Sequence, residues 1–179
     1  MHSFSSSGII LKRSDIGEMD RVVTVFTKDY GKLTTIAKGC RKMTSSKLSA
    51  LEPGTFSKIH LIKTHSMPIL TQASIINDFA GSRFDLTSFR KVFEILEIVD
   101  SLLVDEDDQP FVFEKTLEML THLHTQTPAN ASFIRTRLSQ IIESLGFSHQ
   151  AEVDIQKPVK DLVEEITQRK LKAYAYLNL

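Results

Sequence analysis

The feature of this sequence that most constrains its fold is a change in the spacing of its apolar residues near residue 77. Before this point, short runs of β-branched residues alternate with polar ones at the period of two that marks half-buried strands. After it, apolar residues recur every third or fourth position, the period of an amphipathic helix. We therefore expect an α+β protein, with a β-domain at residues 1–80 and an all-helical domain at residues 81–179.

The β-domain is predicted to contain five short strands, spaced by roughly ten residues. Turn-forming residues separate them, and Gly17 and Gly31 occupy turns where a positive φ would be tolerated best by glycine. Strands this short and evenly spaced favour a small closed antiparallel barrel over a parallel sheet. The expected strands lie within residues 8–13, 21–27, 32–38, 58–61 and 69–76.

The second part of the chain predicts four amphipathic helices. Asp85 is a suitable N-cap for the first, and an acidic run at 105–108 separates it from a second helix that begins near Pro110. The third helix follows residue 128 and is expected to end at Gly146, where a left-handed C-terminal cap is needed. A shorter fourth helix is expected within residues 158–176. The acidic run is interpreted as a solvated turn between helices.

The net charge of zero hides an asymmetry between the two halves. Residues 1–75 hold eleven Lys and Arg against five Asp and Glu, a net charge of +6, and residues 76–179 carry −6. A basic domain attracts polyanions because each phosphate that Lys or Arg neutralises releases condensed counterions. Charge alone does not exclude the alternative that the charged residues of both halves are only solvated surface residues.

The basic residues of the β-domain are the candidate binding residues. On an OB-like barrel, such residues form a groove that follows a nucleic-acid backbone. Few aromatic residues accompany them, since Phe26 and Phe56 are expected in the core and only Phe4 and Tyr30 remain. The sequence thus favours backbone contacts over base stacking. The candidates are Lys12, Arg13, Arg21, Lys28, Lys32, Lys38, Arg41, Lys42 and Lys47.

No catalytic or metal-binding motif stands out. GxSxG, GxxxxGK[ST] and HExxH are absent, and His122 and His124, two positions apart on a helix, point in different directions and are expected at the surface. The single cysteine, Cys40, excludes an internal disulfide and a cysteine-based zinc module. Its basic neighbours would lower its pKa, but a small packing residue is the preferred interpretation. Asp15, Glu18 and Asp20 are interpreted as turn-forming residues.

The chain has neither a run of apolar residues long enough to cross a membrane nor the basic-then-apolar layout of a secretory signal. A cytoplasmic location is therefore expected.

A series of short motifs is informative through its order and spacing. The motifs are Gly8-Ile9-Ile10-Leu11, Gly17-Glu18-Met19-Asp20-Arg21, Phe26-Thr27, Tyr30-Gly31-Lys32-Leu33, Ala37-Lys38-Gly39-Cys40-Arg41-Lys42, Leu51-Glu52-Pro53, Phe84-Asp85-Leu86 and Leu145-Gly146-Phe147. Over about residues 7–147, the sequence resembles the RecO family of recombination mediators.

This resemblance implies an N-terminal OB-fold followed by a helical domain. It also implies binding to single- and double-stranded DNA, annealing of complementary strands, and loading of RecA together with RecR and single-stranded DNA-binding protein. Many members carry a four-cysteine zinc module after the position of Phe147, and this chain lacks those cysteines, so neither metal nor cofactor is expected. At matching positions, Arg135 would face the acidic tail of single-stranded DNA-binding protein. The DNA-contacting residues would be Arg21, Lys32, Lys38, Arg41 and Lys42.

The leading hypothesis is therefore a DNA-binding recombination mediator without catalytic turnover. The alternative is a protein-interaction adaptor whose basic barrel binds acidic segments of partners. A metal-dependent nuclease ranks third, because the acidic residues concentrate in the helical half, away from the basic residues.

Overall fold

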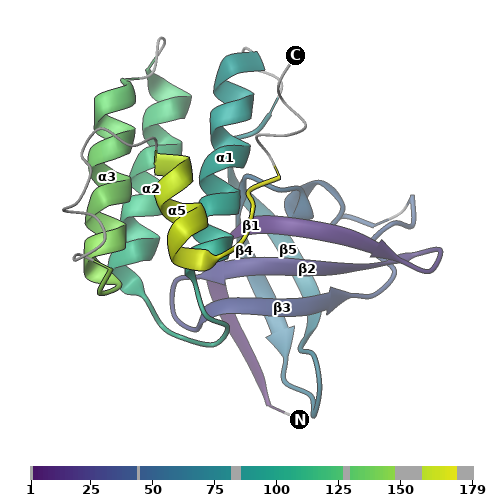
Figure 1. Ribbon diagram of the computed structural model, residues 1–179. Coiled ribbons are helices and arrows are strands. Elements are labelled where there is room, and N and C mark those ends of the chain that lie inside the picture. Colours follow the sequence, from purple (N-terminus) through teal and green to yellow (C-terminus); the bar gives the residue numbers. More distant parts are fainter. Residues whose placement is uncertain (1, 44, 82–85, 127–129, 148–158, 173–179) are drawn as a thin grey trace. The chain divides into compact units, whose positions relative to one another are not determined.

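A computed structural model describes residues 2–43, 45–81, 86–126, 130–147 and 159–172 (Figure 1). The chain divides into two compact units. The first comprises Met1–Gly81 together with Val104–Gln109, and the second comprises Ser82–Leu103 and Pro110–Leu179. Each unit is described below by itself.

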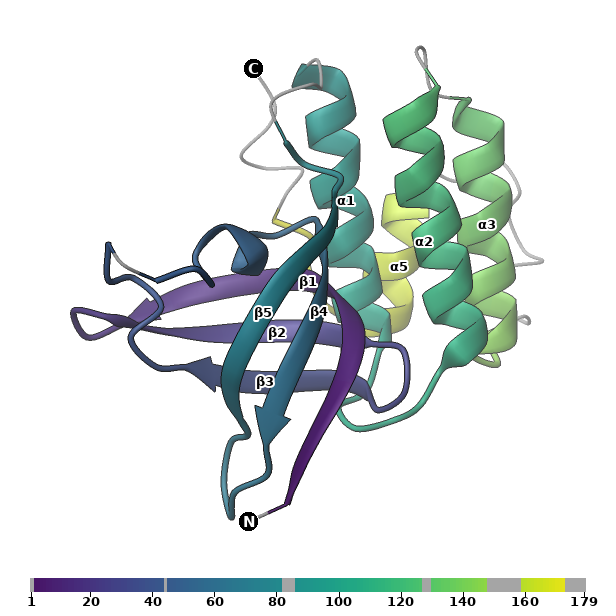
Figure 2. The ribbon, with the colours of Figure 1, turned by 180° about the vertical axis from the view of Figure 1, so that it is seen from behind.

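The first unit is a five-stranded closed barrel with the strand order β1-β2-β3-β5-β4 (Figures 1 and 2). The prediction of a five-stranded OB-type barrel is confirmed, but a uniformly antiparallel sheet is wrong, because β3 and β5 pair in parallel. Directions cannot alternate all the way around a ring of five strands, so one neighbouring pair must be parallel. The strands are β1 (Ser3–Ile16), β2 (Asp20–Thr27), β3 (Gly31–Ala37), β4 (Thr55–Ile62) and β5 (Ile69–Asp78), with a 3-10 turn η1 (Ser49–Leu51) before β4.

The long strand β1 joins the two halves of the barrel. Its first half, Ser3–Ile9, pairs with β4, and its second half, Gly8–Ile16, pairs with β2. The two pairings overlap at Gly8 and Ile9, and a Cβ atom at Gly8 would come within 2.6 Å of Cγ2 of Val25. A register shift follows between Ile10 and Lys12. A bulge of this kind increases the bend and twist that close a small barrel.

The barrel interior is apolar and follows from the alternation in the sequence. Successive strand residues face opposite sides of the sheet, so alternate β-branched and aliphatic residues point inward. Phe26 is fully buried, as predicted, whereas Phe56 is half-buried. The core cluster consists of Ile10, Val23, Val25, Leu33, Ala37, Cys40, Leu51, Ile59, Leu61 and Leu70.

The segment Val104–Gln109 belongs to the barrel unit, although it separates two helices in the sequence. Asp105 forms a parallel bridge with Lys32, and the Glu106 amide donates to the Lys32 carbonyl at 2.8 Å. Gly31, at φ +66°, leaves no room for a side chain, since a Cβ there would overlap the Asp107 carbonyl. The acidic turn is solvated as predicted, but it is also fixed to β3.

The described part of the second unit contains four amphipathic helices where the sequence predicts them, although the last ends earlier than expected. They are α1 (Leu86–Leu102), α2 (Pro110–Thr125), α3 (Ala131–Ser144) and α5 (Val159–Thr167). The predicted left-handed cap at Gly146 is confirmed, with φ +85° and the Phe147 amide donating to Ile142 at 3.1 Å. The predicted cap at Asp85 lies outside the described residues. None of the helices described is long and apolar enough to span a bilayer.

Candidate nucleic-acid interface

A groove of about 760 Å³ crosses the outside of the barrel. Its walls come from strands β1, β4 and β5 on one side and from the segment between β3 and η1 on the other. We call this segment, residues 38–47, the basic loop. The described residues that line the groove include three lysines and a histidine but no carboxylate. They are Ser5, Gly39, Lys42, Ser45, Ser46, Lys47, Lys58, Ile59, His60, Thr71, Gln72, Ala73 and Ser74.

Strand register brings the polar groups of the groove together. His60 on β4 lies between Ser5 on β1 and Gln72 on β5, and Ser5 Oγ and His60 Nδ1 are 2.9 Å apart. Lys58, in the next outward-facing position of β4, pairs with Ser74 on β5. Because Ile59 and Leu61 alternate with these residues and enter the core, the outer face of β4 is polar.

The basic loop supplies the other wall through Lys42 and Lys47. Lys42 is exposed, and the loop turns back at this residue, with the Ser45 amide donating to the Lys42 carbonyl at 2.8 Å. Lys47 is half-buried and its Nζ donates to the Lys38 carbonyl at 3.1 Å. Two cationic side chains therefore stand opposite Lys58 across a polar surface.

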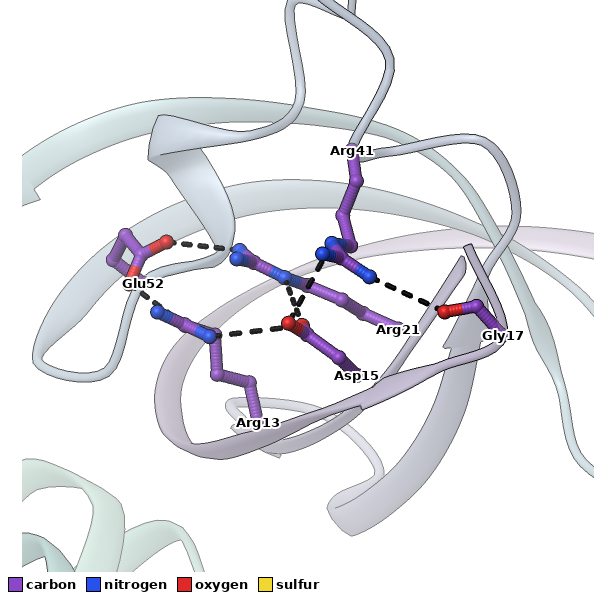
Figure 3. Close-up of polar contacts among 6 residues, drawn as sticks. All are labelled: Arg13, Asp15, Gly17, Arg21, Arg41 and Glu52. Carbon is purple, nitrogen blue, oxygen red and sulfur yellow. Dashed lines mark hydrogen bonds and ion pairs between the residues drawn. The ribbon is translucent and has the colours of Figure 1, made fainter. Parts of the chain in front are cut away.

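Next to the basic loop, three arginines converge on two carboxylates (Figure 3). Arg21 donates to both, with Nε 2.8 Å from Asp15 Oδ1 and Nη1 2.8 Å from Glu52 Oε1. Arg13 reaches the same two carboxylates, at 2.8 Å from Glu52 and 3.7 Å from Asp15. Arg41 lies 3.5 Å from Asp15 Oδ2 and donates to the Gly17 carbonyl at 3.3 Å. We call these five side chains the arginine cluster.

Within the arginine cluster, most of the charge of the three arginines is compensated. The hydrogen bond from Arg21, helped by the nearby charges of Arg41 and Arg13, lowers the pKa of Asp15 below its ordinary value. Asp15 is therefore ionised at neutral pH and shares its charge among three guanidinium groups. Two carboxylates against three arginines leave the cluster with a net charge of only +1.

The sequence-predicted binding residues consequently separate into two groups. The groove contains Lys42 and Lys47, and Lys38 stands on the same loop. The other candidates are not among its lining residues. Three of them, Arg13, Arg21 and Arg41, belong to the arginine cluster. Lys12 and Lys28 are exposed elsewhere on the barrel, and Lys32 is buried with its Nζ 3.4 Å from Asp105.

Sequence reasoning missed Lys58 and His60 as groove residues. Their alternation with Ile59 and Leu61 indicates that they share one face of a strand. The proximity of that face to the basic loop depends on pairing between β1, β4 and β5, which a single sequence does not reveal.

The remaining candidates play structural roles. Cys40 is fully buried in the barrel core, which confirms a packing residue, and burial raises the pKa of its thiol, so the expected lowering is wrong. His122 is half-buried: its ring stacks on Phe133 with the centroids 4.3 Å apart, and Nε2 accepts from the Asn130 amide at 3.1 Å. Within the described ranges, no group of His, Cys, Asp and Glu is arranged to hold a metal ion.

Arg135 is exposed on α3 beside a small pocket in the helical unit. The pocket has a volume of about 220 Å³ and lies among residues of α1, α3 and the start of α5. Lys91, Glu94 and Arg135 contribute its charged groups, and its apolar residues are Ile95, Ile98, Ala131, Ile134, Leu138 and Val159.

Comparison with known proteins agrees with this architecture. The family model described as "Recombination protein O N terminal" matches residues 1–79, the barrel. The DNA repair protein RecO of Myxococcus xanthus is 30% identical over 142 residues, which is 79% of this chain and 58% of the relative. Residues 1–79 thus match the N-terminal domain of the RecO family, and the similarity to a RecO protein extends beyond the barrel.

Other RecO proteins show the same extent of similarity. The DNA repair protein RecO of Syntrophomonas wolfei is 27% identical over 143 residues, covering 80% of this chain and 57% of the relative. The protein of the same name from Bacillus subtilis is 30% identical over 120 residues, or 67% of this chain and 47% of the relative. The chain thus spans between about half and three fifths of the length of these relatives. The comparison identifies the barrel as the N-terminal OB-fold of RecO proteins.

Proposed function

We propose that the groove binds the sugar–phosphate backbone of single- and double-stranded DNA. The observation that carries this proposal is the composition of the groove, in which Lys42, Lys47 and Lys58 come from two separate elements and none of the described lining residues is acidic. Hydroxyl and amide groups between these lysines can donate to phosphate oxygens without reading sequence. Binding is therefore expected to be insensitive to sequence and strongly dependent on salt.

The chemistry of the groove also supports annealing of complementary strands. The described lining residues include no Phe, Tyr or Trp. Aromatic platforms bind single strands by stacking on successive bases, which competes with pairing between strands. A groove that holds the backbone and leaves the base edges free lets two bound strands pair. Annealing without catalytic turnover is the activity that we assign to the protein.

The position of the DNA can be tested with two double charge reversals. Lys42→Glu/Lys58→Glu changes exposed lysines on both walls of the groove, whereas Lys28→Glu/Lys63→Glu changes exposed lysines that do not line it. These pairs alter the net charge equally, so they separate local contacts from the overall field. Arg41 is left unchanged because its loss would also disturb the arginine cluster.

The measurement is fluorescence anisotropy of a labelled oligothymidine across a salt series. We expect the groove variant to bind about tenfold more weakly at low salt, from the loss of two lysine–phosphate contacts of about 0.7 kcal/mol each. Its salt slope should fall by about 1.4, or about 0.7 for each phosphate on a single strand. Equal affinities of the two variants would show that DNA does not occupy the groove.

The same assay separates DNA binding from the adaptor function. If the barrel is an adaptor, a labelled oligo-aspartate peptide will bind it at least as tightly as DNA does and will resist added salt better. The DNA-binding function is supported if a low concentration of DNA displaces the peptide and the same concentration of peptide does not displace DNA.

We further propose that the protein acts with RecR and single-stranded DNA-binding protein in loading RecA. Similarity to RecO proteins supports this role, and the pocket beside Arg135 suits a peptide that combines acidic and apolar residues. Arg135 and Lys91 would pair with its carboxylates, and Ile95 and Leu138 would contact its apolar end. Loss of binding of the acidic tail peptide in Arg135→Glu, with DNA binding unchanged, is the expected result; tail binding that persists in this variant would exclude the pocket.

A further inference from the structure

We propose that Asp20 is a positioning residue for DNA binding, which it supports by holding the basic loop in place through the Gly39 amide. The inference rests on the proposed DNA-binding function of the groove. Asp20 does not line the groove itself. Its effect on DNA passes through the loop that carries Lys42 and Lys47.

The turn between β1 and β2 contacts the start of the basic loop at consecutive points. Asp20 Oδ1 accepts a hydrogen bond of 2.7 Å from the Gly39 amide. The Met19 carbonyl accepts from the Arg41 amide at 3.1 Å. The Gly17 carbonyl accepts from the Arg41 guanidinium at 3.3 Å, a contact that is visible in Figure 3. One turn of the barrel therefore holds both the backbone and a side chain of the loop.

Both ends of this contact are well fixed. Asp20 pairs with Ile16 at the end of the β1–β2 ladder, so its carboxylate extends from a rigid strand. On the loop side, Cys40 is fully buried between the two held amides and anchors the chain in the core. Gly39 has φ +62°, a left-handed conformation that glycine adopts without strain. The loop thus leaves the barrel in a defined direction.

The lysines of the groove follow immediately. The Lys42 amide donates to the Gly39 carbonyl at 3.3 Å, so the turn that presents Lys42 is built on the residue that Asp20 holds. Lys47 is tied to the same region through the Lys38 carbonyl. A loop that is ordered before DNA arrives avoids the entropic cost of ordering its side chains on binding. Asp20 would therefore increase affinity although its own charge repels phosphate.

Two variants of Asp20 separate the effect of its negative charge on DNA binding from the effect of its hydrogen bond to the basic loop. Asp20→Asn and Asp20→Ala both remove the negative charge, and simple electrostatics predicts that both bind DNA more tightly, to the same extent. Only Asp20→Asn keeps an oxygen that can accept from the Gly39 amide. A difference between the two variants therefore reports positioning with the charge held constant.

We expect Asp20→Asn to bind an oligothymidine at least as tightly as wild type and Asp20→Ala to bind about fivefold more weakly than Asp20→Asn, the effect of one lost hydrogen bond. In a Lys42→Gln/Lys47→Gln background the difference should vanish, because the loop then places no lysine in the groove. A mere loss of stability would lower affinity in that background as well. Equal affinities of Asp20→Asn and Asp20→Ala, in folded proteins, would overturn the inference.

A second measurement does not depend on a variant that folds. Hydrogen–deuterium exchange of free wild-type protein should show the Gly39 and Arg41 amides already protected, with little change when oligothymidine is added. Rapid exchange in the free protein, with protection only in the complex, would contradict a pre-positioned loop. Failure of wild type to bind DNA would instead refute the proposed function, so the two outcomes are distinguishable.

Discussion

Replacing Arg21 by methionine tests whether this arginine stabilises the barrel or contacts DNA. The side chain is only 8% exposed and donates two hydrogen bonds of 2.8 Å to carboxylates. Methionine retains much of the aliphatic volume but removes the guanidinium. Asp15 and Glu52 would then face each other with fewer partners, next to Arg13 and Arg41.

The expected cost follows from the surroundings of the cluster. Breaking a fully buried ion pair costs about 3–5 kcal/mol, because the remaining charge is buried without compensation. Here the two carboxylates are 40% and 41% exposed and keep other arginine partners, so solvent and Arg13 offset part of that penalty. We expect a loss of about 2 kcal/mol in the free energy of unfolding of the barrel.

The assay is urea unfolding followed by circular dichroism, combined with DNA titration of the folded variant. A lower midpoint with an unchanged slope indicates a change in stability alone. Arg21→Lys should recover part of the loss, since an ammonium keeps the charge but not the two-pronged geometry. A variant with wild-type stability and markedly weaker DNA binding would rule out the structural role and return Arg21 to the DNA-contacting residues.

Three further predictions concern other parts of the chain. Gly31→Ala should lower the stability of the barrel by more than the roughly 1–2 kcal/mol of left-handed strain alone, because the new Cβ would overlap Asp107. Gly17→Ala is the control, since Gly17 has φ +55° but open space around it, and should show only the strain. Equal shifts in the thermal midpoints of the two variants would contradict this prediction. Because the pKa of Asp15 is lowered in the folded state, its carboxylate stabilises the fold at pH values above its ordinary pKa of 3.8. This contribution is lost as the pH falls through the pKa of the folded state. The difference in urea midpoint between wild type and Asp15→Asn should therefore shrink with acidification, and a constant difference would exclude the linkage. Asn130→Ala should cost about 1 kcal/mol by removing the acceptor for two amides at the start of α3, and Asn130→Ser should restore most of it in thermal melts; no loss in the alanine variant would show that the cap is dispensable.

Most of the fold that could be predicted from the sequence follows from patterns among residues that are close together in the chain. Alternation at a period of two located the strands, and repeats of three and four located the helices. Glycine positions were informative where the backbone required them: Gly17, Gly31 and Gly146 all adopt positive φ. These features depend on residues close together in the chain, which explains why a single sequence reveals them.

Features that depend on distant residues were not predictable in the same way. The parallel pairing of β3 with β5 follows from closure of the ring, and the acidic turn at 104–109 is held by β3, although Lys32 and Asp105 lie far apart in the sequence. Candidate binding residues were chosen by charge, but the charge of Arg21 is neutralised by Glu52, which is 31 positions away. Composition counts such a residue as available for DNA, and only the folded barrel shows its partner.

The place where DNA binds can be mapped on the barrel by NMR chemical-shift perturbation of backbone amides during titration with an oligothymidine. Binding in the groove predicts the largest shifts at Lys42, Lys58, His60 and Gln72, decreasing as salt is added. Largest shifts at Lys28 and Tyr30, in the turn between β2 and β3, with the groove residues unchanged, would contradict the proposed position of the DNA.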